Sequence, residues 1–104
     1  MKIAYFGDDL FSCCMEMLLR SHHEIIHLFT VEHVLSQKVR QAATKHGIPV
    51  TLSKPSKDNI EVLNQKGCEM ILSAGYSHKI PEWEGGSMRY GMNIHPSLLP
   101  EGAG

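Results

Sequence analysis

The order of its apolar segments is the feature that most constrains how this chain can fold. Short apolar runs alternate with stretches in which apolar residues recur at helical spacing. Strands that alternate with helices form parallel sheets covered on both faces. The sequence therefore predicts one α/β domain over residues 1–104, with a mostly parallel sheet and helices on both faces. The expected strands are 2–6, 24–30, 48–52, 68–74 and 90–95, and the expected helices are 10–20, 33–46 and 55–67.

The expected helices carry recognisable end signals. Asp8 or Asp9 can cap the first helix, Ser56 can cap the third, and Gly47 follows the second at a typical C-terminal position. Helical periodicity also predicts which side chains face the core. These are Leu10, Cys14, Met17 and Leu18 in the first helix, Leu35, Val39, Ala42 and Ala43 in the second, and Ile60 and Leu63 in the third.

Composition and charge argue against several classes of protein. The chain is 42% hydrophobic and 20% charged, which is typical of a folded domain, and its net charge of -1 gives no sign of a dedicated nucleic-acid binder. Three cysteines, two of them adjacent, do not suggest a disulfide framework, and the apolar runs are too short to cross a bilayer. We expect a cytoplasmic protein without membrane contact. We expect no metal site either, because His23 and His27 would lie about 13 Å apart on a strand.

The segment that ends the last expected strand carries the chemistry. Asn93 and His95 are two residues apart, so their side chains should leave the strand on the same face before Pro96 ends the pairing. A carboxamide N–H can donate to an oxygen that gains negative charge, and an imidazole can move a proton near neutral pH. Acyl transfer to an amine needs both groups. Spacing alone leaves open a pair that only satisfies nearby backbone groups.

Residues 93–100 read Asn-Ile-His-Pro-Ser-Leu-Leu-Pro, and this octapeptide resembles the signature of the folate-dependent formyltransferases. That family includes methionyl-tRNA, glycinamide ribonucleotide and sugar-nucleotide N-formyltransferases. Residues 1–7, 45–50 and 74–81 are similar to its opening strand, its third-strand approach and its pterin loop. The resemblance implies a Rossmann-like fold and 10-formyltetrahydrofolate as the formyl donor.

The resemblance also implies roles for particular residues. Asn93 would steady the formyl oxygen, and His95 would shuttle the proton. The pterin of the folate would lie near His78, Lys79 and Ile80, held partly by backbone groups. The third catalytic residue of the family is an Asp some tens of residues after the signature.

This chain stops at Gly104, before any such Asp. We therefore expect the N-terminal part of a formyltransferase domain, truncated after the catalytic strand and inactive by itself. Its last strand would leave an exposed sheet edge, which invites self-association. The alternative hypothesis is a non-catalytic folding or association module derived from the same fold.

The amine acceptor is harder to predict. Asp8 and Asp9 would repel the phosphate of glycinamide ribonucleotide. The chain lacks the basic surface and the Thr-Pro-Glu-Phe-like turn expected for a tRNA acceptor, so a nucleic-acid partner is not expected. A small-molecule amine, an amino-sugar nucleotide, is the remaining prediction. The related hydrolase tends to carry His-Ser-Phe where this chain has Pro-Ser-Leu at 96–98, which favours transfer over hydrolysis.

Overall fold

A five-stranded parallel sheet forms the centre of the structure, a computed structural model that describes residues 1–94. The strand order is β3-β2-β1-β4-β5, and every neighbouring pair is parallel. The predicted α/β fold with a parallel sheet is thus confirmed. The strands are β1 (Lys2–Gly7), β2 (Glu24–Phe29), β3 (Val50–Thr51), β4 (Met70–Ala74) and β5 (Tyr90–Ile94).

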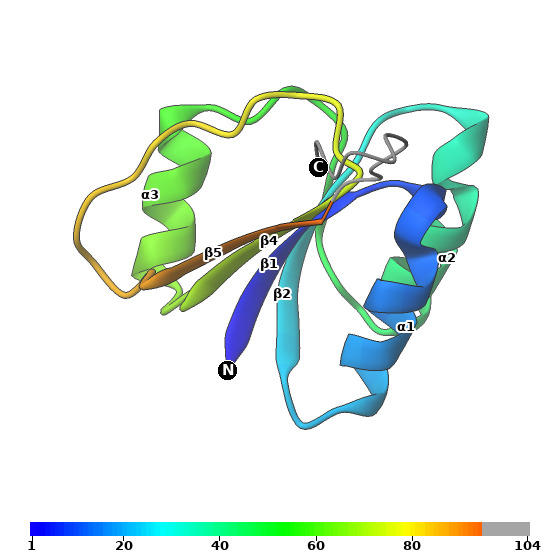
Figure 1. Ribbon diagram of the computed structural model, residues 1–104, viewed down its shortest axis with the longest axis horizontal. Coiled ribbons are helices and arrows are strands. Elements are labelled where there is room, and N and C mark those ends of the chain that lie inside the picture. The colour runs from blue at the N-terminus through cyan, green and yellow to red at the C-terminus, as the bar shows by residue number, and fades with distance from the viewer. Residues whose placement is uncertain (95–104) are drawn as a thin grey trace, which may run out of the picture.

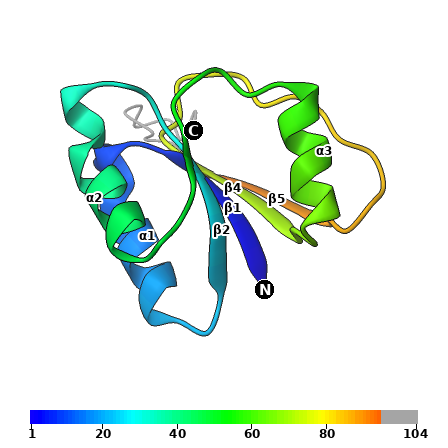
Figure 2. The same cartoon turned by 180° about the vertical axis from the view of Figure 1, so that it is seen from behind.

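Helices cover both faces of this sheet. Helices α1 (Ser12–Arg20) and α2 (Gln37–Lys45) lie side by side on one face, and α3 (Lys57–Gln65) covers the other (Figures 1 and 2). Alternate strand residues point to opposite faces, so β1 feeds two cores. Its Ile3 and Tyr5 pack with Met15 of α1, whereas Phe6 packs with Ile60 of α3.

The carboxyl ends of the strands meet at one edge of the sheet. The last residue of β1, Gly7, pairs with Ala74 at the end of β4. A Cβ atom on Gly7 would lie 2.4 Å from the carbonyl oxygen of Ala74, so only glycine allows this approach. The chain order reverses between β1 and β4, and ligands of such sheets bind beyond the strand ends at this kind of reversal.

The first two helices begin later than predicted, and this changes which residues they bury. A short 3-10 helix, η1 (Asp9–Phe11), precedes α1, and another, η2 (Val34–Ser36), precedes α2. The predicted inward positions of Leu10, Met17 and Leu35 are wrong, because these side chains are 63%, 70% and 60% exposed. The tighter turns of a 3-10 helix shift the helical phase, so Met15 becomes the fully buried residue of α1.

The other predicted core positions in the three helices are confirmed. Val39, Ala43, Ile60 and Leu63 are buried, and Cys14, Leu18 and Ala42 pack partly buried against the core. No helix within residues 1–94 combines the length and apolar composition needed to span a membrane.

Side-chain caps fix where the helices start. The Asp8 carboxylate accepts a hydrogen bond from the Leu10 N–H at 2.9 Å, which confirms an Asp cap for the first helical turn. Ser56 caps α3 as predicted, in a reciprocal capping box with Asn59. Gly47 and Gly67, which follow α2 and α3, have φ of 66° and 79°, a backbone conformation that favours glycine at helix ends.

Candidate active site

A pocket of about 380 Å³ opens between β4, β5 and the loop of residues 75–89. Four of the five predicted site residues line it: Asn93, His78, Lys79 and Ile80. The fifth, His95, lies outside the described residues. The rest of the lining consists of Ile71, Ser73, Tyr76, Trp83, Gly91 and Met92.

The pairing of β4 with β5 places Asn93 in this pocket. Asn93 is the register partner of Ser73, and Gly91 is the partner of Ile71 two residues earlier. Partners on parallel strands point to the same face, so all four residues look toward the α3 side of the sheet. Because β5 is an outer strand of the described sheet, Asn93 stays exposed while its backbone is held in the ladder.

The 75–89 loop, which forms the other wall, is tied to the scaffold at both ends. Near its start, the Gly75 N–H donates to the Ile94 carbonyl at 3.0 Å. Near its end, the Met88 N–H donates to Oδ1 of Asn64 at 3.2 Å, and the Ser87 hydroxyl donates to the Cys68 carbonyl at 2.7 Å. The loop arches past α3 between these anchors (Figure 1). The pocket wall is therefore positioned by the fold itself.

Trp83 joins the pocket wall to the core. Its side chain packs partly buried against the α3-side core and also lines the pocket. A Cβ atom on Gly91 would lie 3.0 Å from the Trp83 ring, so the indole rests directly on β5 at its glycine.

Tyr76 is a pocket residue that the sequence reasoning did not assign. Its ring meets Phe6 edge-on at 5.4 Å and His78 edge-on at 5.6 Å. Its hydroxyl oxygen is buried and has no hydrogen-bond partner within residues 1–94. Burial raises the pKa of Tyr76 to about 12, so the hydroxyl remains a donor at neutral pH. Its place directly after Gly75, in the segment that resembles the pterin loop, was the available signal.

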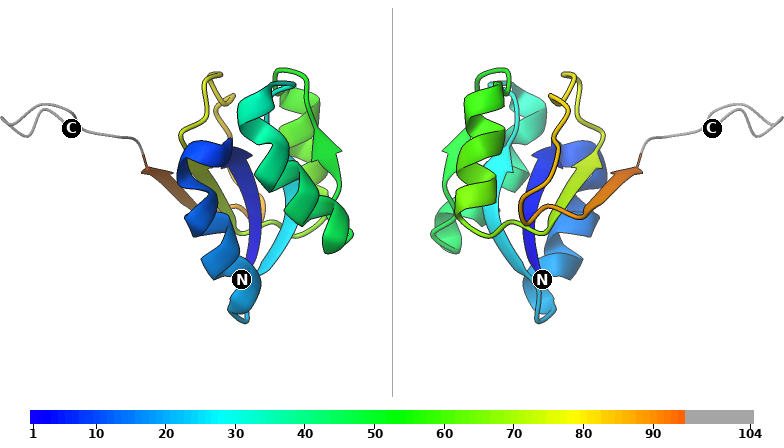
Figure 3. Two further views of the ribbon diagram at one scale, coloured as in Figure 1. Left: turned by 90° about the vertical axis from the view of Figure 1, so that its right-hand side faces the viewer. Right: turned by 90° about the vertical axis from the view of Figure 1, so that its left-hand side faces the viewer.

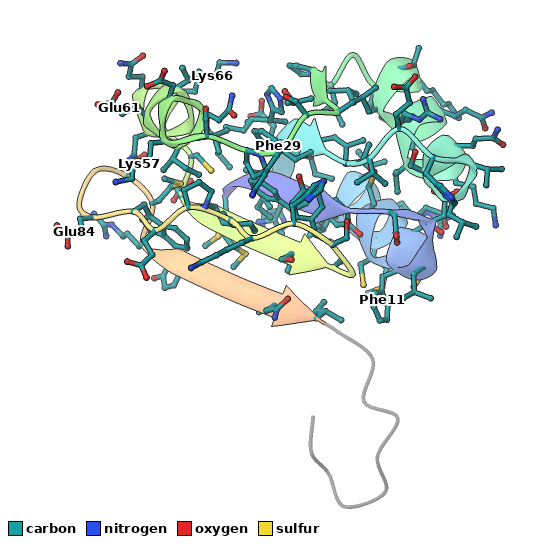
Figure 4. The ribbon with its side chains drawn as sticks, turned by 90° about the horizontal axis from the view of Figure 1, so that it is seen from above. Phe11, Phe29, Lys57, Glu61, Lys66 and Glu84 are labelled. Atoms are coloured by element: carbon teal, nitrogen blue, oxygen red, sulfur yellow. The ribbon has the colours of Figure 1, made fainter. Side chains whose placement is uncertain are left out.

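A second and larger hollow of about 860 Å³ lies on the other side of the loop, against α3. The two hollows share Lys79 and Trp83 as lining residues. Figure 4 shows Glu84 of the loop facing the part of α3 that carries Lys57 and Glu61, and all three line this second hollow. Among the described residues that line the first pocket, by contrast, Lys79 alone has a fixed charge.

No family model matches the chain. It is 34% identical to a methionyl-tRNA formyltransferase of Alkaliphilus oremlandii over 119 aligned residues, which cover all of this chain and 38% of that protein. The methionyl-tRNA formyltransferase of Acidobacterium capsulatum is 31% identical, over 97% of this chain and 37% of its own length. That of Anaplasma marginale is 30% identical over the whole chain.

The chain belongs to the formyltransferase family. It spans a little over a third of the length of these relatives. The part of the family fold that it represents holds the β4–β5 pocket and the loop beside it.

The turn of residues 7–12 does not line the Asn93 pocket; its Asp8, Asp9 and Leu10 line a separate hollow with η2 and the start of α2. The Asp9 carboxylate accepts hydrogen bonds from the N–H groups of Lys38 and Val39 at 3.1 and 3.0 Å. The two carboxylates of the turn thus cap helices, and Asp9 already occupies the amino end of α2.

Within residues 1–94, no three His, Cys, Asp or Glu side chains gather as a metal site would require.

Proposed function

We propose that this chain supplies the donor pocket and the catalytic strand of an enzyme that moves a formyl group from 10-formyltetrahydrofolate to an amine. The observation that carries the proposal is the shared pocket: Asn93 lies with His78, Lys79 and Ile80 around one opening. Residues of two strands and of the loop between them converge there because β5 pairs with β4 and the loop returns over both.

The pocket has the chemistry that a pterin needs. Ile71, Ile80 and Trp83 give apolar walls for a flat ring, and the polar groups of Asn93 and Tyr76 lie among them. A mostly apolar lining with a few polar groups is typical of small-molecule sites, and this volume lies near the lower end of their range of about 300–1,000 Å³. We therefore assign the pocket to the ring and the formyl end of the donor.

Bound there, the donor supplies an activated formyl carbon. The Asn93 carboxamide donates a hydrogen bond to the formyl oxygen, which gains negative charge as the amine attacks. His95, one residue beyond β5, takes the proton that the acceptor nitrogen loses when the new carbon–nitrogen bond forms. It returns this proton to the folate nitrogen as the bond between that nitrogen and the formyl carbon breaks, so that tetrahydrofolate leaves. Both roles follow from the signature of residues 93–100 and remain proposals.

The names of the relatives favour a different acceptor from the one expected from the sequence. The proteins described above are methionyl-tRNA formyltransferases, so we propose the α-amino group of methionyl-tRNA as the acceptor. The amino-sugar nucleotide gains no support from them. The low net charge that argued against tRNA describes the whole chain, and it does not describe any one face.

Donor binding tests the pocket directly. Isothermal titration of the chain with a non-reactive 10-formyltetrahydrofolate analogue should give heat, and Ile80→Asp should abolish it by placing a charge in the apolar wall. Val62→Asp, an exposed position on α3, is the matched control and should bind like the unchanged chain. Equal binding by the Ile80 and Val62 variants would remove the pocket from donor recognition.

The catalytic roles are tested by measuring formylation of methionyl-tRNA with the full natural protein that contains this sequence. Asn93→Ala should lower kcat for formylation of methionyl-tRNA about 10²–10³-fold, the usual effect of removing one oxyanion donor. His95→Ala should lower it by a similar order because proton transfer is lost. Both variants should keep their affinity for the donor analogue. Ser77→Ala, on an exposed loop position, serves as the control, and wild-type turnover in Asn93→Ala would refute the assigned role.

A second candidate function, self-association, is favoured by the outer edge of β5. Within residues 1–94 this strand pairs with β4 alone, and its Tyr90 and Met92 are each 51% exposed. An open strand edge with apolar neighbours can pair with another chain. Sedimentation equilibrium should then show a dimer that Met92→Lys dissociates. A monomer at all concentrations would exclude this function.

A further inference from the structure

The net charge of -1 conceals an uneven distribution of charge in the fold. Helix α2 carries Lys38, Arg40 and Lys45 and contains no acidic residue. Both lysines are exposed, and Arg40 is half-buried. At 1.5 Å per residue the helix is about 13 Å long, so three positive charges occupy a short stretch. In the left view of Figure 3, α2 lies beside α1 in front of the sheet, with its outer side uncovered.

The outer side of α2 is hollowed and lined by hydrogen-bond donors. A depression of about 570 Å³ is lined by Gln37, Arg40, Gln41, Thr44 and Lys45. These residues recur every three or four positions and form one stripe of the helix. The hydrogen bonds of Arg40 go to the backbone carbonyls of Ser36 and His33, both at 3.4 Å, and do not neutralise its charge.

The positive charge continues onto the neighbouring helix. A groove between α1 and α2 is lined by Arg20, Lys45 and His46, and Glu16 is the one carboxylate among its lining residues. At the other end of α2, Lys38 borders the hollow at the carboxyl edge of the sheet. Two carboxylates line the same hollow: Asp8 accepts the N–H of Leu10, and Asp9 accepts backbone N–H groups of α2.

We propose that this surface, the α2 face of Gln37, Lys38, Arg40, Gln41 and Lys45, binds the phosphate backbone of an RNA. The identity of the RNA as the tRNA acceptor rests on the proposed function, whereas the phosphate chemistry rests on the face itself. Each strand of a duplex carries one phosphate per about 3.4 Å, so about 13 Å of helix faces enough phosphates for three cations. None of the five side chains is apolar, and a protein interface would need an apolar core.

One end of the α2 face lies at the carboxyl edge of the sheet. Its Lys38 end lies at the edge of the sheet where all described strands terminate, next to Leu10 and Asp9 at the end of β1. An RNA lying along α2 is thereby directed to the carboxyl edge, while the donor pocket opens on the opposite, α3 side. The face contributes affinity without sequence specificity, because phosphate contacts position a nucleic acid and base contacts specify it.

Salt-dependent RNA binding tests the proposal. Fluorescence anisotropy of a labelled methionine tRNA, titrated with the chain at several salt concentrations, gives the slope of log K against log salt. The double variant Lys38→Gln/Lys45→Gln should reduce the magnitude of this slope by about 2, and adding Arg40→Gln by about 1 more. At 0.1 M salt each lost contact should weaken binding roughly eightfold.

The matched control removes the same charge from the opposite face. Lys57→Gln/Lys66→Gln changes the two ends of α3, which are labelled in Figure 4, and should leave slope and affinity unchanged. Because Arg40 contacts the backbone before α2, the triple variant is checked for an unchanged melting temperature. The double variant alters exposed side chains alone and decides the matter by itself.

Three results would overturn the inference: no tRNA binding by the unchanged chain, equal losses in the α2 and α3 variants, or a poly-glutamate peptide that binds the α2 face as tightly as tRNA. Failure of the proposed function gives a different result, because the donor analogue then does not bind while the α2 face still binds tRNA. Intact donor binding without tRNA binding removes the α2 face alone.

Discussion

Two adjacent glycines in the pocket loop allow a sharp test of how the loop is anchored. Gly85 and Gly86 have nearly equal φ values of 66° and 70°, so alanine is strained by the same backbone conformation at both. A Cβ atom on Gly85 meets nothing within 4 Å. A Cβ atom on Gly86 would lie 2.5 Å from Oδ1 of Asn64, the acceptor of the Met88 N–H. The two substitutions therefore differ mainly in this one contact.

The difference in unfolding free energy follows from that contact. Alanine in a left-handed conformation costs about 1–2 kcal/mol, and this applies to Gly85→Ala and Gly86→Ala alike. In Gly86→Ala the Asn64 side chain must also move away. Its movement leaves the N–H of Met88, a buried residue, without a partner. An unsatisfied buried donor costs a further 1–3 kcal/mol or so. We expect Gly86→Ala to be the more destabilising by about that amount.

Urea unfolding measures this difference, and the single tryptophan, Trp83, reports from the same loop. The decisive comparison repeats Gly86→Ala in an Asn64→Ala background. There the clash is absent, so Gly86→Ala should cost no more than Gly85→Ala. Equal losses for the two glycine variants in the unchanged background would refute the proposed anchoring of the loop through Asn64.

Three further predictions concern single groups. Asp9→Ala should lower the free energy of unfolding by about 1 kcal/mol in urea titration, because Lys38 and Val39 lose their cap, and Asp9→Asn should restore most of it. Burial lowers the pKa of His27 below 6.5. Below pH 6.5 the unfolded chain therefore binds more protons than the folded chain. The free energy of unfolding should decrease as the pH falls from 6.5 to the folded pKa of His27, and the decrease should be smaller in His27→Gln. Tyr76→Phe should leave the thermal midpoint unchanged or higher, since it removes a buried hydroxyl without a partner in residues 1–94, and a large loss would reveal a missed contact.

The parallel sheet was predictable because strand and helix signals alternate along the chain, and this alternation dictates a parallel sheet. The helix starts were less predictable. Leu10 and Leu35 have the right spacing for a buried helical face, yet each falls in a 3-10 turn. The start of α2 is held by the Asp9 carboxylate, which accepts hydrogen bonds from N–H groups about thirty residues away in the sequence. A pattern of neighbouring residues cannot reveal a contact over that separation.

Some residues of the candidate site were predictable from the sequence, and others were not. Asn93 and the 78–80 segment were named from a motif, and their shared pocket follows from the β4–β5 register. Tyr76 and Trp83 were not assigned roles because their positions depend on Phe6 and on Gly91. The basic α2 face was missed for a different reason. A net charge sums over the chain, and the acidic residues that balance α2 are carried by other elements.

The two proposed sites lie on opposite faces of one sheet, and this has a consequence for binding order. The donor pocket belongs to the α3 side, and the α2 face belongs to the α1–α2 side, so the two ligands share no lining residue (Figures 2 and 3). Ligands that share no contacts and require no change of conformation bind with zero coupling free energy. A saturating donor analogue should then leave the tRNA affinity unchanged in the anisotropy assay. A severalfold change would mean that the carboxyl edge of the sheet moves when either site is filled.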